Sequence, residues 1–243
     1  MRRVVPAPAT RILRAMKGRL WPDNRYQLLL REVRRTRPCT RVVEVGTWNG
    51  ARAEQLAMAA LSSNAHVTYH GFDLFEMQTE EDFAEELSKR PPSEATVRER
   101  LERFAAMLAG GPWRPWSRHG RGVRPWMPRS FSYELHKGYT RDTMPAFADE
   151  HERSVDFVFI DGGHSIETIE NDWTCAARLV RVGGTIVLDD HYQNDALTDR
   201  FGCNFLRERL RLDPAWDVDV LPVVDVVPEM GGIQLLRATY RGG

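Results

Sequence analysis

Short apolar runs and segments of helical periodicity alternate along the 243 residues of the chain. Runs rich in β-branched and aromatic residues predict strands at 41–45, 66–72, 131–137, 155–160 and 184–188. Apolar positions at helical spacing predict helices at 11–19, 25–35, 51–61, 141–153 and 165–180. This alternation predicts an α/β fold with a doubly wound, mostly parallel sheet and right-handed crossovers.

The end of the chain predicts a closing edge for this sheet. A helix is expected near 195–212, followed by strands at 216–220 and 232–238 that pair antiparallel. Hydrophobic residues make up 42% of the chain and charged residues 28%, which is typical of a globular protein with a sizeable core. We therefore expect one domain over 1–243, in which 1–38 forms N-terminal helices.

One insertion departs from the alternation of strand and helix. About sixty residues separate the second and third predicted strands, where a crossover usually needs far fewer. The insertion, 74–131, begins with two charged amphipathic helices at 79–89 and 93–108. The stretch 110–130 follows, with three Trp, four Pro, five Arg, His119 and no acidic residue. We expect a lid over a bound ligand, with a structural flap or a dimer contact as the alternative.

Charge and cysteine content exclude several classes of protein. Lys plus Arg equals Asp plus Glu at 34 each, so the net charge favours neither a nucleic-acid nor a membrane partner. Cys39, Cys175 and Cys203 lie far apart, which fits a reducing compartment better than a disulfide framework or a CxxC metal site. No apolar run approaches the roughly 18 residues of a membrane span, and the N-terminal segment lacks the apolar stretch of a signal peptide. A cytoplasmic location is expected.

The turn after the first predicted strand has the features of a nucleoside site. Ligands of a doubly wound sheet bind at the carboxyl ends of the strands, and Gly46 and Gly50 lie at the first of these ends. Glu44 stands where a dinucleotide fingerprint has its first glycine, and an acid there suits a ligand with an amino group. Asp73 ends the second strand, where a carboxylate can bind ribose hydroxyls. Together these residues favour a nucleoside ligand.

Three carboxylates are expected at neighbouring strand ends. Asp161 follows the fourth strand, and Asp189 and Asp190 follow the fifth. Such acids repel one another unless a cation neutralises them, and oxygen ligands suit Mg²⁺, Mn²⁺ or Ca²⁺, with Mg²⁺ favoured. In the alternative interpretation, Asp161 is an acid of a metal-independent site. His164 and His191 are the nearest candidate bases, and a plain hydrogen-bonding role for either stays open.

Four segments together resemble the ordered motifs of class I S-adenosylmethionine-dependent methyltransferases. They are 43–50 (VEVGTWNG), 72–73 (FD), 158–165 (VFIDGGHS) and 183–190 (GGTIVLDD). The nearest group is that of the small-molecule O-methyltransferases related to macrocin and novobiocin-type sugar methyltransferases. The resemblance covers 42–190. It implies a Rossmann-like, seven-stranded sheet whose last strand is antiparallel, with S-adenosylmethionine as the methyl donor.

The resemblance also implies which residues contact the cofactor. Glu44 and Gly46 would flank its methionine moiety, and Asp73 would hold its ribose. Tyr139 and Thr140 would lie near its adenine. The full implied set is Glu44, Gly46, Thr47, Asn49, Gly50, Asp73, Tyr139, Thr140 and Asp161.

The resemblance bears on the metal and on the base as well. Relatives that use a divalent metal place their acidic ligands where this chain has Asp161, Asp189 and Asp190. Catechol-type methyltransferases have a lysine base at the position of His164. This departure leaves the catalytic set as Asp161, His164 and His191, with the identity of the base open.

The sequence thus predicts metal-assisted O-methylation of a small-molecule hydroxyl, of the sugar or natural-product type. A metal-independent methyltransferase acting on RNA or another anionic acceptor is the first alternative, based on the Arg/Trp-rich stretch 110–130. A nicotinamide-dependent oxidoreductase is disfavoured by Glu44, and a metal-dependent hydrolase leaves the cofactor turn unexplained. The expected partner is a small-molecule acceptor, and one interpretation makes it anionic. Nucleic-acid and membrane partners are disfavoured. Formation of a homo-oligomer stays open.

Overall fold

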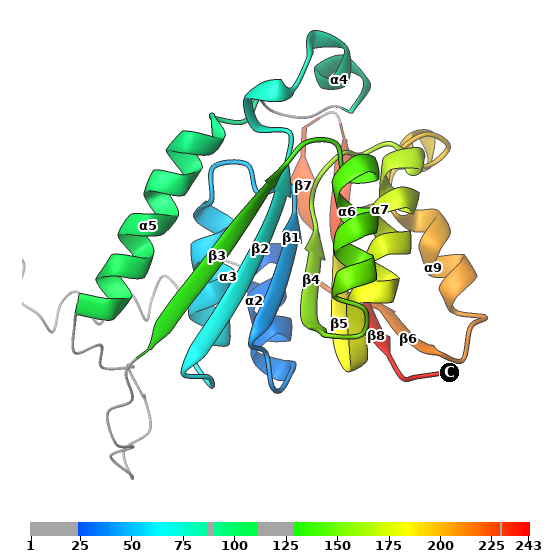
Figure 1. Cartoon of the computed structure of the whole chain (residues 1–243). Coiled ribbons are helices and arrows are strands. Elements are labelled where there is room, and N and C mark those ends of the chain that lie inside the picture. The colour runs from blue at the N-terminus through cyan, green and yellow to red at the C-terminus, as the bar shows by residue number, and fades with distance from the viewer. Residues whose placement is uncertain (1–23, 87–89, 111–128, 229) are drawn as a thin grey trace, which may run out of the picture.

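The computed structural model describes residues 24–86, 90–110, 129–228 and 230–243 (Figure 1). Its centre is an eight-stranded sheet in the order β3-β2-β1-β4-β5-β8-β6, with β7 also paired to β8. The strands are β1 (Arg41–Val45), β2 (His66–Asp73), β3 (Ser130–Lys137), β4 (Val155–Ile160), β5 (Val180–Tyr192), β6 (Trp216–Val220), β7 (Asp225–Val227) and β8 (Gly231–Tyr240). The first five strands are mutually parallel, and β8 pairs antiparallel with its neighbours. The predicted sheet is confirmed, with one more strand than expected because the short β7 was not recognised.

Helices cover both faces of this sheet. They are α2 (Arg25–Arg35), α3 (Ala51–Ala60), the 3-10 turn η1 (Phe75–Met77), α4 (Glu80–Glu85), α5 (Glu94–Gly110), α6 (Thr140–Glu150), α7 (Ile166–Leu179), α8 (Asp195–Thr198) and α9 (Asn204–Leu210). Apolar side chains of α2, α3 and α5 form one core cluster on the sheet. Those of α6, α7 and α9 form a second cluster on the other face. The layers are therefore those of a doubly wound sheet.

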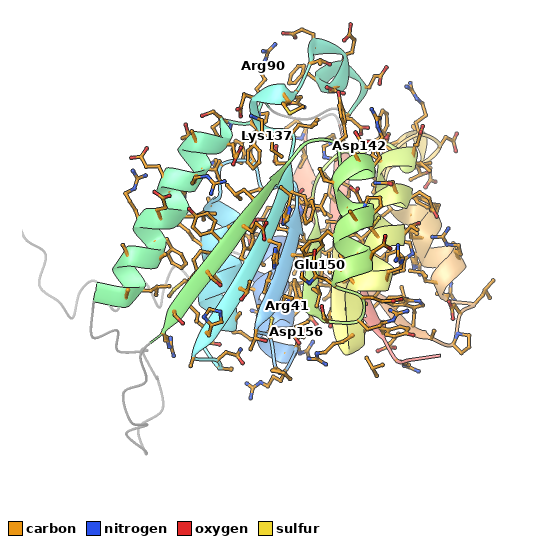
Figure 2. The ribbon with its side chains drawn as sticks, in the orientation of Figure 1. Arg41, Arg90, Lys137, Asp142, Glu150 and Asp156 are labelled. Atoms are coloured by element: carbon orange, nitrogen blue, oxygen red, sulfur yellow. The ribbon has the colours of Figure 1, made fainter. Side chains whose placement is uncertain are left out.

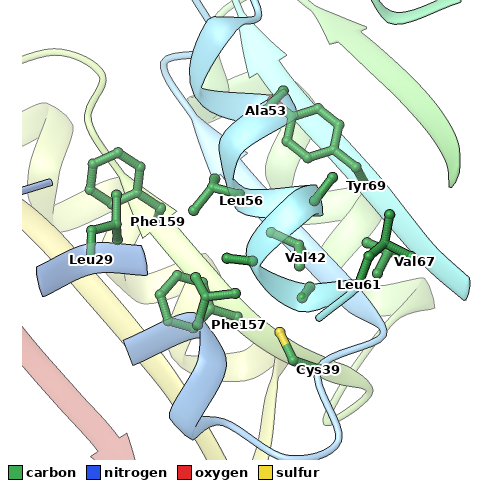
Figure 3. Close-up of a cluster of buried hydrophobic side chains, with 14 of the residues drawn as sticks. Leu29, Cys39, Val42, Ala53, Leu56, Leu61, Val67, Tyr69, Phe157 and Phe159 are labelled. Carbon is green, nitrogen blue, oxygen red and sulfur yellow. The ribbon is translucent and has the colours of Figure 1, made fainter. Parts of the chain in front are cut away.

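Strand β4 lies at the centre of both clusters. Phe157 and Phe159 point into the first cluster, where Figure 3 shows them beside Leu29 of α2. Val158 and Ile160 point into the second. All six residues of the strand are buried, as expected for a parallel strand covered on both faces.

The amino ends of the central strands are joined by a carboxylate. Asp156 of β4 accepts hydrogen bonds from the backbone nitrogens of Thr40 and Arg41, at 2.7 and 2.9 Å. It also forms an ion pair with Arg181 of β5. Figure 2 shows Arg41 and Asp156 together at this end of the sheet, far from Lys137 at the carboxyl end of β3. This buried acid is therefore a structural one.

Two predicted boundaries after β4 were wrong. Strand β5 has 13 residues instead of the five at 184–188, because it begins at Val180 beside Val155 of β4 and continues to Tyr192 along β8. The single helix predicted at 195–212 is divided into α8 and α9. Between them Gly202 has a φ of 86°, and a Cβ there would lie 2.5 Å from the carbonyl oxygen of Asp190. A continuous helix cannot accommodate that turn.

The insertion is helical where it is described. Helix α4 is shorter than the helix predicted at 79–89, and Thr79 and Asp82 form a capping box at its start. Helix α5 has 17 residues and packs along the outer edge of the sheet. The predicted helix at 11–19 and nearly all of the stretch 110–130 lie outside the described residues, so the lid stays a prediction. In the described part of the chain, no helix is long and apolar enough to cross a bilayer.

Candidate active site

A cavity of about 580 Å³ lies at the carboxyl ends of the parallel strands. The chain runs from β1 towards β2 on one side and from β4 towards β5 on the other, so this is the topological switch point of the sheet. The cavity is lined by ten of the predicted site residues: Gly46, Thr47, Asn49, Asp73, Tyr139, Thr140, Asp161, His164, Asp189 and Asp190. Glu44, Gly50 and His191 are not among its lining residues.

Gly46 allows the turn after β1 to pack against the end of β4. Its φ is 86°, and a Cβ would lie 1.9 Å from the carbonyl oxygen of Asp161. The backbone nitrogen of Asp161 in turn donates to Val45 at 2.8 Å. Gly50 also has a positive φ, of 73°, where it begins α3, and the Asn49 side chain accepts from the nitrogen of Ala51. Gly46 therefore shapes the cavity wall because it allows close packing of backbone against backbone.

Glu44 lies behind the cavity wall in a fully buried position. Its Oε2 accepts a hydrogen bond from the hydroxyl of Tyr69 at 2.5 Å, and that hydroxyl lies 3.2 Å from Thr47 Oγ1. Its Oε1 has no hydrogen-bond partner among the described residues. Burial raises the pKa of the Glu44 carboxyl to about 8, against the effect of the Tyr69 hydrogen bond. This acid supports Thr47 through Tyr69, and its predicted contact with the cofactor remains a prediction.

Asp73 joins the two loops that form one end of the cavity. Its Oδ2 accepts from the backbone nitrogen of Trp48 at 2.7 Å, and its Oδ1 from that of Phe75 at 2.6 Å. Both donors have a positive φ, of 47° and 50°, which is uncommon for residues other than glycine. Asp73 therefore holds the turns after β1 and β2 in a fixed relation, with its half-buried carboxylate at the cavity.

Helix α4 crosses above the cavity and is held at both sides. Figure 1 shows it above the carboxyl ends of the strands. On one side Tyr139 donates its hydroxyl hydrogen to Asp82, with an O–O distance of 3.0 Å. On the other side Glu86 accepts hydrogen bonds from the backbone nitrogen of Ser165 at 2.7 Å and from the hydroxyl of Thr168 at 2.6 Å. We call this segment, residues 79–86, the strap.

The three predicted carboxylates converge, and an irregularity of β5 makes this possible. The pairing of β5 with β8 shifts between Leu188 and His191, and Asp190 has a φ of 64°. Asp189 and Asp190 can therefore both line the cavity, whereas a regular strand would send them to opposite faces. Burial, followed by the charges of Asp189 and Asp190, raises the pKa of Asp161 far above its ordinary value.

The positive charge beside these three carboxylates comes from an arginine side chain. Arg25 of α2 binds Asp189 with both ends of its guanidinium group, Nε to Oδ1 at 2.8 Å and Nη2 to Oδ2 at 3.1 Å. The hydroxyl of Tyr26 donates to the same Oδ2 at 3.0 Å. Arg25 also forms an ion pair with Asp225.

This arrangement does not fit the predicted divalent ion. Both oxygens of Asp189 are already bound to Arg25 and Tyr26. Among the described residues, the carboxylate oxygens of the three aspartates do not form a cluster in which all ligand atoms lie within 4.8 Å of one another. Metal binding by Asp161, Asp189 and Asp190 is therefore a prediction that the observed geometry does not favour.

The two candidate bases lie in different surroundings. His164 lines the cavity, and its Nε2 is 3.2 Å from Oδ2 of Asp190. Its Nδ1 has no hydrogen-bond partner among the described residues. His191 is not at the cavity, and burial together with the charge of Arg207 lowers its pKa. The geometry favours His164 over His191 as the base.

The cavity, its glycine turn and its carboxylates agree with one family of sequences. Residues 43–191, more than half of the chain, match the family described as a methyltransferase domain. The chain belongs to this methyltransferase family. This membership agrees with the resemblance seen in the motifs and opposes the oxidoreductase and hydrolase alternatives. A comparison with curated proteins gives no match.

Solved structures show the same fold for this methyltransferase. The O-methyltransferase TomG from Streptomyces achromogenes, involved in tomaymycin synthesis and solved with SAM, is 19% identical, with a TM-score of 0.55 over 88% of this chain and 78% of TomG. Cofactor-bound Rv0187 from MTB is 19% identical, with a TM-score of 0.56 over 98% of this chain and 92% of that protein. A putative rRNA-methylase from Clostridium thermocellum is 15% identical, with a TM-score of 0.54 over 91% and 98%. At these identities the likeness shows the fold alone.

Sequence reasoning missed one buried acid of the methyltransferase cavity. Asp172 lies on the apolar face of α7 and is fully buried. Its Oδ1 accepts from Asn171, while its Oδ2 has no partner among the described residues, and the side chain lines the cavity near Thr140. Burial raises the pKa of Asp172 to about 7. An acid within the apolar stripe 166, 169, 173 and 177 was the signal that could have identified it.

Proposed function

We propose that this methyltransferase uses S-adenosylmethionine to methylate a hydroxyl oxygen of a small anionic molecule. The observation that carries the proposal is a single cavity with two chemically distinct ends. Asp73 at the end of β2 and Tyr139 after β3 lie on one side of the switch point, whereas Arg25 and His164 contact Asp189 and Asp190 of β5 on the other. Its volume of about 580 Å³ is in the range of sites for cofactors and small ligands.

The first end suits the nucleoside part of the cofactor. Asp172 Oδ2 is a buried acceptor without a hydrogen-bond donor among the described residues, and a nucleoside supplies such donors on its amino and hydroxyl groups. Asp73 adds a carboxylate at the end of β2, where ribose hydroxyls bind in doubly wound folds. The residues present therefore fit S-adenosylmethionine, which supplies an electrophilic methyl group on a sulfonium sulfur when bound.

The other end suits deprotonation of a hydroxyl group. His164 Nε2 lies 3.2 Å from Oδ2 of Asp190, so Asp190 accepts its hydrogen and orients the ring. The remaining nitrogen, Nδ1, is then the one that takes the hydroxyl proton as the oxygen bonds to the methyl carbon. S-adenosylmethionine would supply the methyl group and would leave as its neutral thioether product. Methyl transfer is otherwise a matter of holding oxygen, carbon and sulfur in line.

Cationic side chains at the cavity support an anionic acceptor. Arg52 and Arg141 line it and stack on the rings of Tyr26 and Tyr139 at 3.6 and 4.2 Å, whereas Arg25 is already paired with Asp189 and Asp225. Arginine binds carboxylate and phosphate groups through paired hydrogen bonds. The strap across the cavity and the balanced net charge favour a small acceptor over RNA. No step in this proposal requires the divalent metal.

Binding of the demethylated cofactor, S-adenosylhomocysteine, tests the proposal. We expect saturable binding in calorimetry to protein treated with EDTA, weakened at least about tenfold in Asp172→Asn, with no binding of NAD⁺. Glu150→Gln, at an exposed position at the end of α6, is the matched control. A panel of phosphorylated and carboxylated hydroxyl compounds, assayed in EDTA, then identifies the acceptor class. Binding of NAD⁺ in place of S-adenosylhomocysteine contradicts the proposal, and full dependence of turnover on added Mg²⁺ contradicts its metal-free step.

A further inference from the structure

A cluster of histidines lies on β2 and β3, outside the cavity. In the parallel register His70 is opposite Glu134, and Phe72 is opposite His136. Because alternate residues of a strand share a face, His70, Glu134 and His136 all lie on the face that α6 covers. Strand β3 is the edge of the sheet (Figure 1), so the cluster is close to solvent on one side. The proposed methyl transfer uses none of these side chains.

The spacing of their polar atoms is that of a metal ligand set. His70 Nδ1 lies 3.3 Å from His136 Nε2 and 3.6 Å from Glu134 Oε2. The three ligand atoms are all within 4.8 Å of one another. A tetrahedral zinc ion with bonds of about 2.0–2.1 Å holds its ligand atoms about 3.3–3.4 Å apart. The observed distances need only a small adjustment to reach this arrangement.

The surroundings keep the imidazoles neutral and oriented. The ring of Phe147 on α6 lies 4.8 Å from that of His70 and 5.1 Å from that of His136, and Phe72 stacks on His136. Burial, followed by the neighbouring His136 and His151, lowers the pKa of His70 to about 3. Burial also lowers the pKa of His136. Neutral imidazole is the form that binds a metal, so no proton has to be removed at neutral pH.

We propose that His70, Glu134 and His136 form a binding site for a zinc-type transition-metal ion. Two imidazole nitrogens and one carboxylate oxygen suit Zn²⁺, whereas Mg²⁺ and Ca²⁺ prefer oxygen ligands. Such an ion ties the edge strand β3 to β2. Strand β3 leads directly into Tyr139 and Thr140 of the cavity, so the ion would stabilise that wall at a distance from the reaction.

The binding of Zn²⁺ alone to tag-free, chelator-treated protein tests this site. We expect one equivalent to bind in calorimetry, a rise in melting temperature that grows with Zn²⁺ concentration, and no such rise with Mg²⁺. Co²⁺ in its place should give the absorption bands of a tetrahedral site. The absence of saturable Zn²⁺ binding overturns the proposal.

Three variants locate the ion. Glu134→Gln and His136→Gln should each weaken Zn²⁺ binding by more than about tenfold. Loss of a residue that only hydrogen-bonds to a metal ligand already weakens binding by about tenfold or more, and loss of a ligand itself should have a larger effect. The Glu134 side chain is largely exposed, so its replacement leaves the core intact even if His136→Gln folds poorly. His66→Gln is the control, because His66 is an exposed histidine of β2 whose ring nitrogens lie within hydrogen-bond distance of Ser130 and Thr68. Equal loss of Zn²⁺ binding in His66→Gln, or none in Glu134→Gln, overturns the assignment.

Discussion

Arg25 and Asp189 are 164 residues apart in the chain and form a two-pronged ion pair, with nitrogen–oxygen distances of 2.8 and 3.1 Å. Their side chains are 12% and 1% exposed. The pair joins the first turn of α2 to the carboxyl end of β5, so the helix that precedes the sheet completes the wall of the cavity. A guanidinium group with two parallel hydrogen bonds neutralises the carboxylate at fixed geometry.

Removing one partner of this pair should be costly. Arg25→Ala leaves Asp189 buried without its cation, and we expect it to lower the free energy of unfolding by about 3–5 kcal/mol. Replacing both partners by apolar residues, as Arg25→Met with Asp189→Leu, should recover most of that loss because neither charge of the pair is then left buried without its partner. Urea unfolding of the three proteins measures both effects.

An exposed ion pair gives the control for this prediction. Arg103 and Glu99 on α5 are joined at 2.7 Å, and their side chains are 67% and 68% exposed. Arg103→Ala should cost less than about 1 kcal/mol because water and salt screen the pair. If Arg25→Ala is no more destabilising than Arg103→Ala, the pair with Asp189 is not formed in solution as described.

The two glycines of the turn after β1 should differ in their tolerance of alanine. Both have a positive φ, which costs about 1–2 kcal/mol for alanine. A Cβ on Gly46 would also meet backbone of Asp161 at 1.9 Å, whereas a Cβ on Gly50 meets the movable side chain of Val97 at 3.1 Å. We expect Gly46→Ala to cost about 3 kcal/mol or more and to lose cofactor binding, and Gly50→Ala about 1–2 kcal/mol. Equal melting temperatures of the two variants contradict this explanation.

Much of the fold was predictable from local pattern. Strands β1 and β4 were predicted to the residue, because β-branched and aromatic runs bounded by turn residues are strong local signals. The full length of β5 and the division of α8 from α9 were not predicted. Both depend on contacts with distant residues, such as the pairing of Tyr192 with Ile233 and the packing of Gly202 against Asp190.

The site was predictable where the chain order determines it. Acids at the ends of β2, β4 and β5 must meet at one edge of a parallel sheet, so the positions of Asp73, Asp161 and Asp190 followed from the strands. The pairing of Asp189 with Arg25, which disfavours the predicted metal, was not predictable, because nothing in the sequence indicates that Arg25 reaches Asp189. The docking of Glu86 on Ser165 is equally non-local. Such contacts depend on tertiary packing, which the spacing of apolar residues along the sequence does not predict.

The buried Glu44 should make the stability of the protein depend on pH. Its pKa is raised from 4.5 to about 8 in the folded protein, so the folded state binds more protons than the unfolded state between these values. The contribution to stability is therefore fully present below about pH 4.5 and is lost as pH rises towards 8, by at most about 1.4 kcal/mol per pH unit. Glu44→Gln should flatten the dependence of unfolding free energy on pH relative to the wild type. If the unfolding free energies of the two proteins depend on pH in the same way, the raised pKa of the buried Glu44 carboxyl is contradicted.

The strap should control how fast the cofactor leaves. Glu86 holds one side of it by hydrogen bonds to Ser165 and Thr168, at distances of 2.6–2.8 Å. Glu86→Ala removes these bonds at the surface of the cavity, so we expect the dissociation rate of S-adenosylhomocysteine to rise several-fold with little change in melting temperature. Stopped-flow displacement measures the rate. Glu81→Ala, on the exposed side of α4, is the control because Glu81 makes no described contact with the cavity wall. If both variants release the ligand at the wild-type rate, the strap does not gate the cavity.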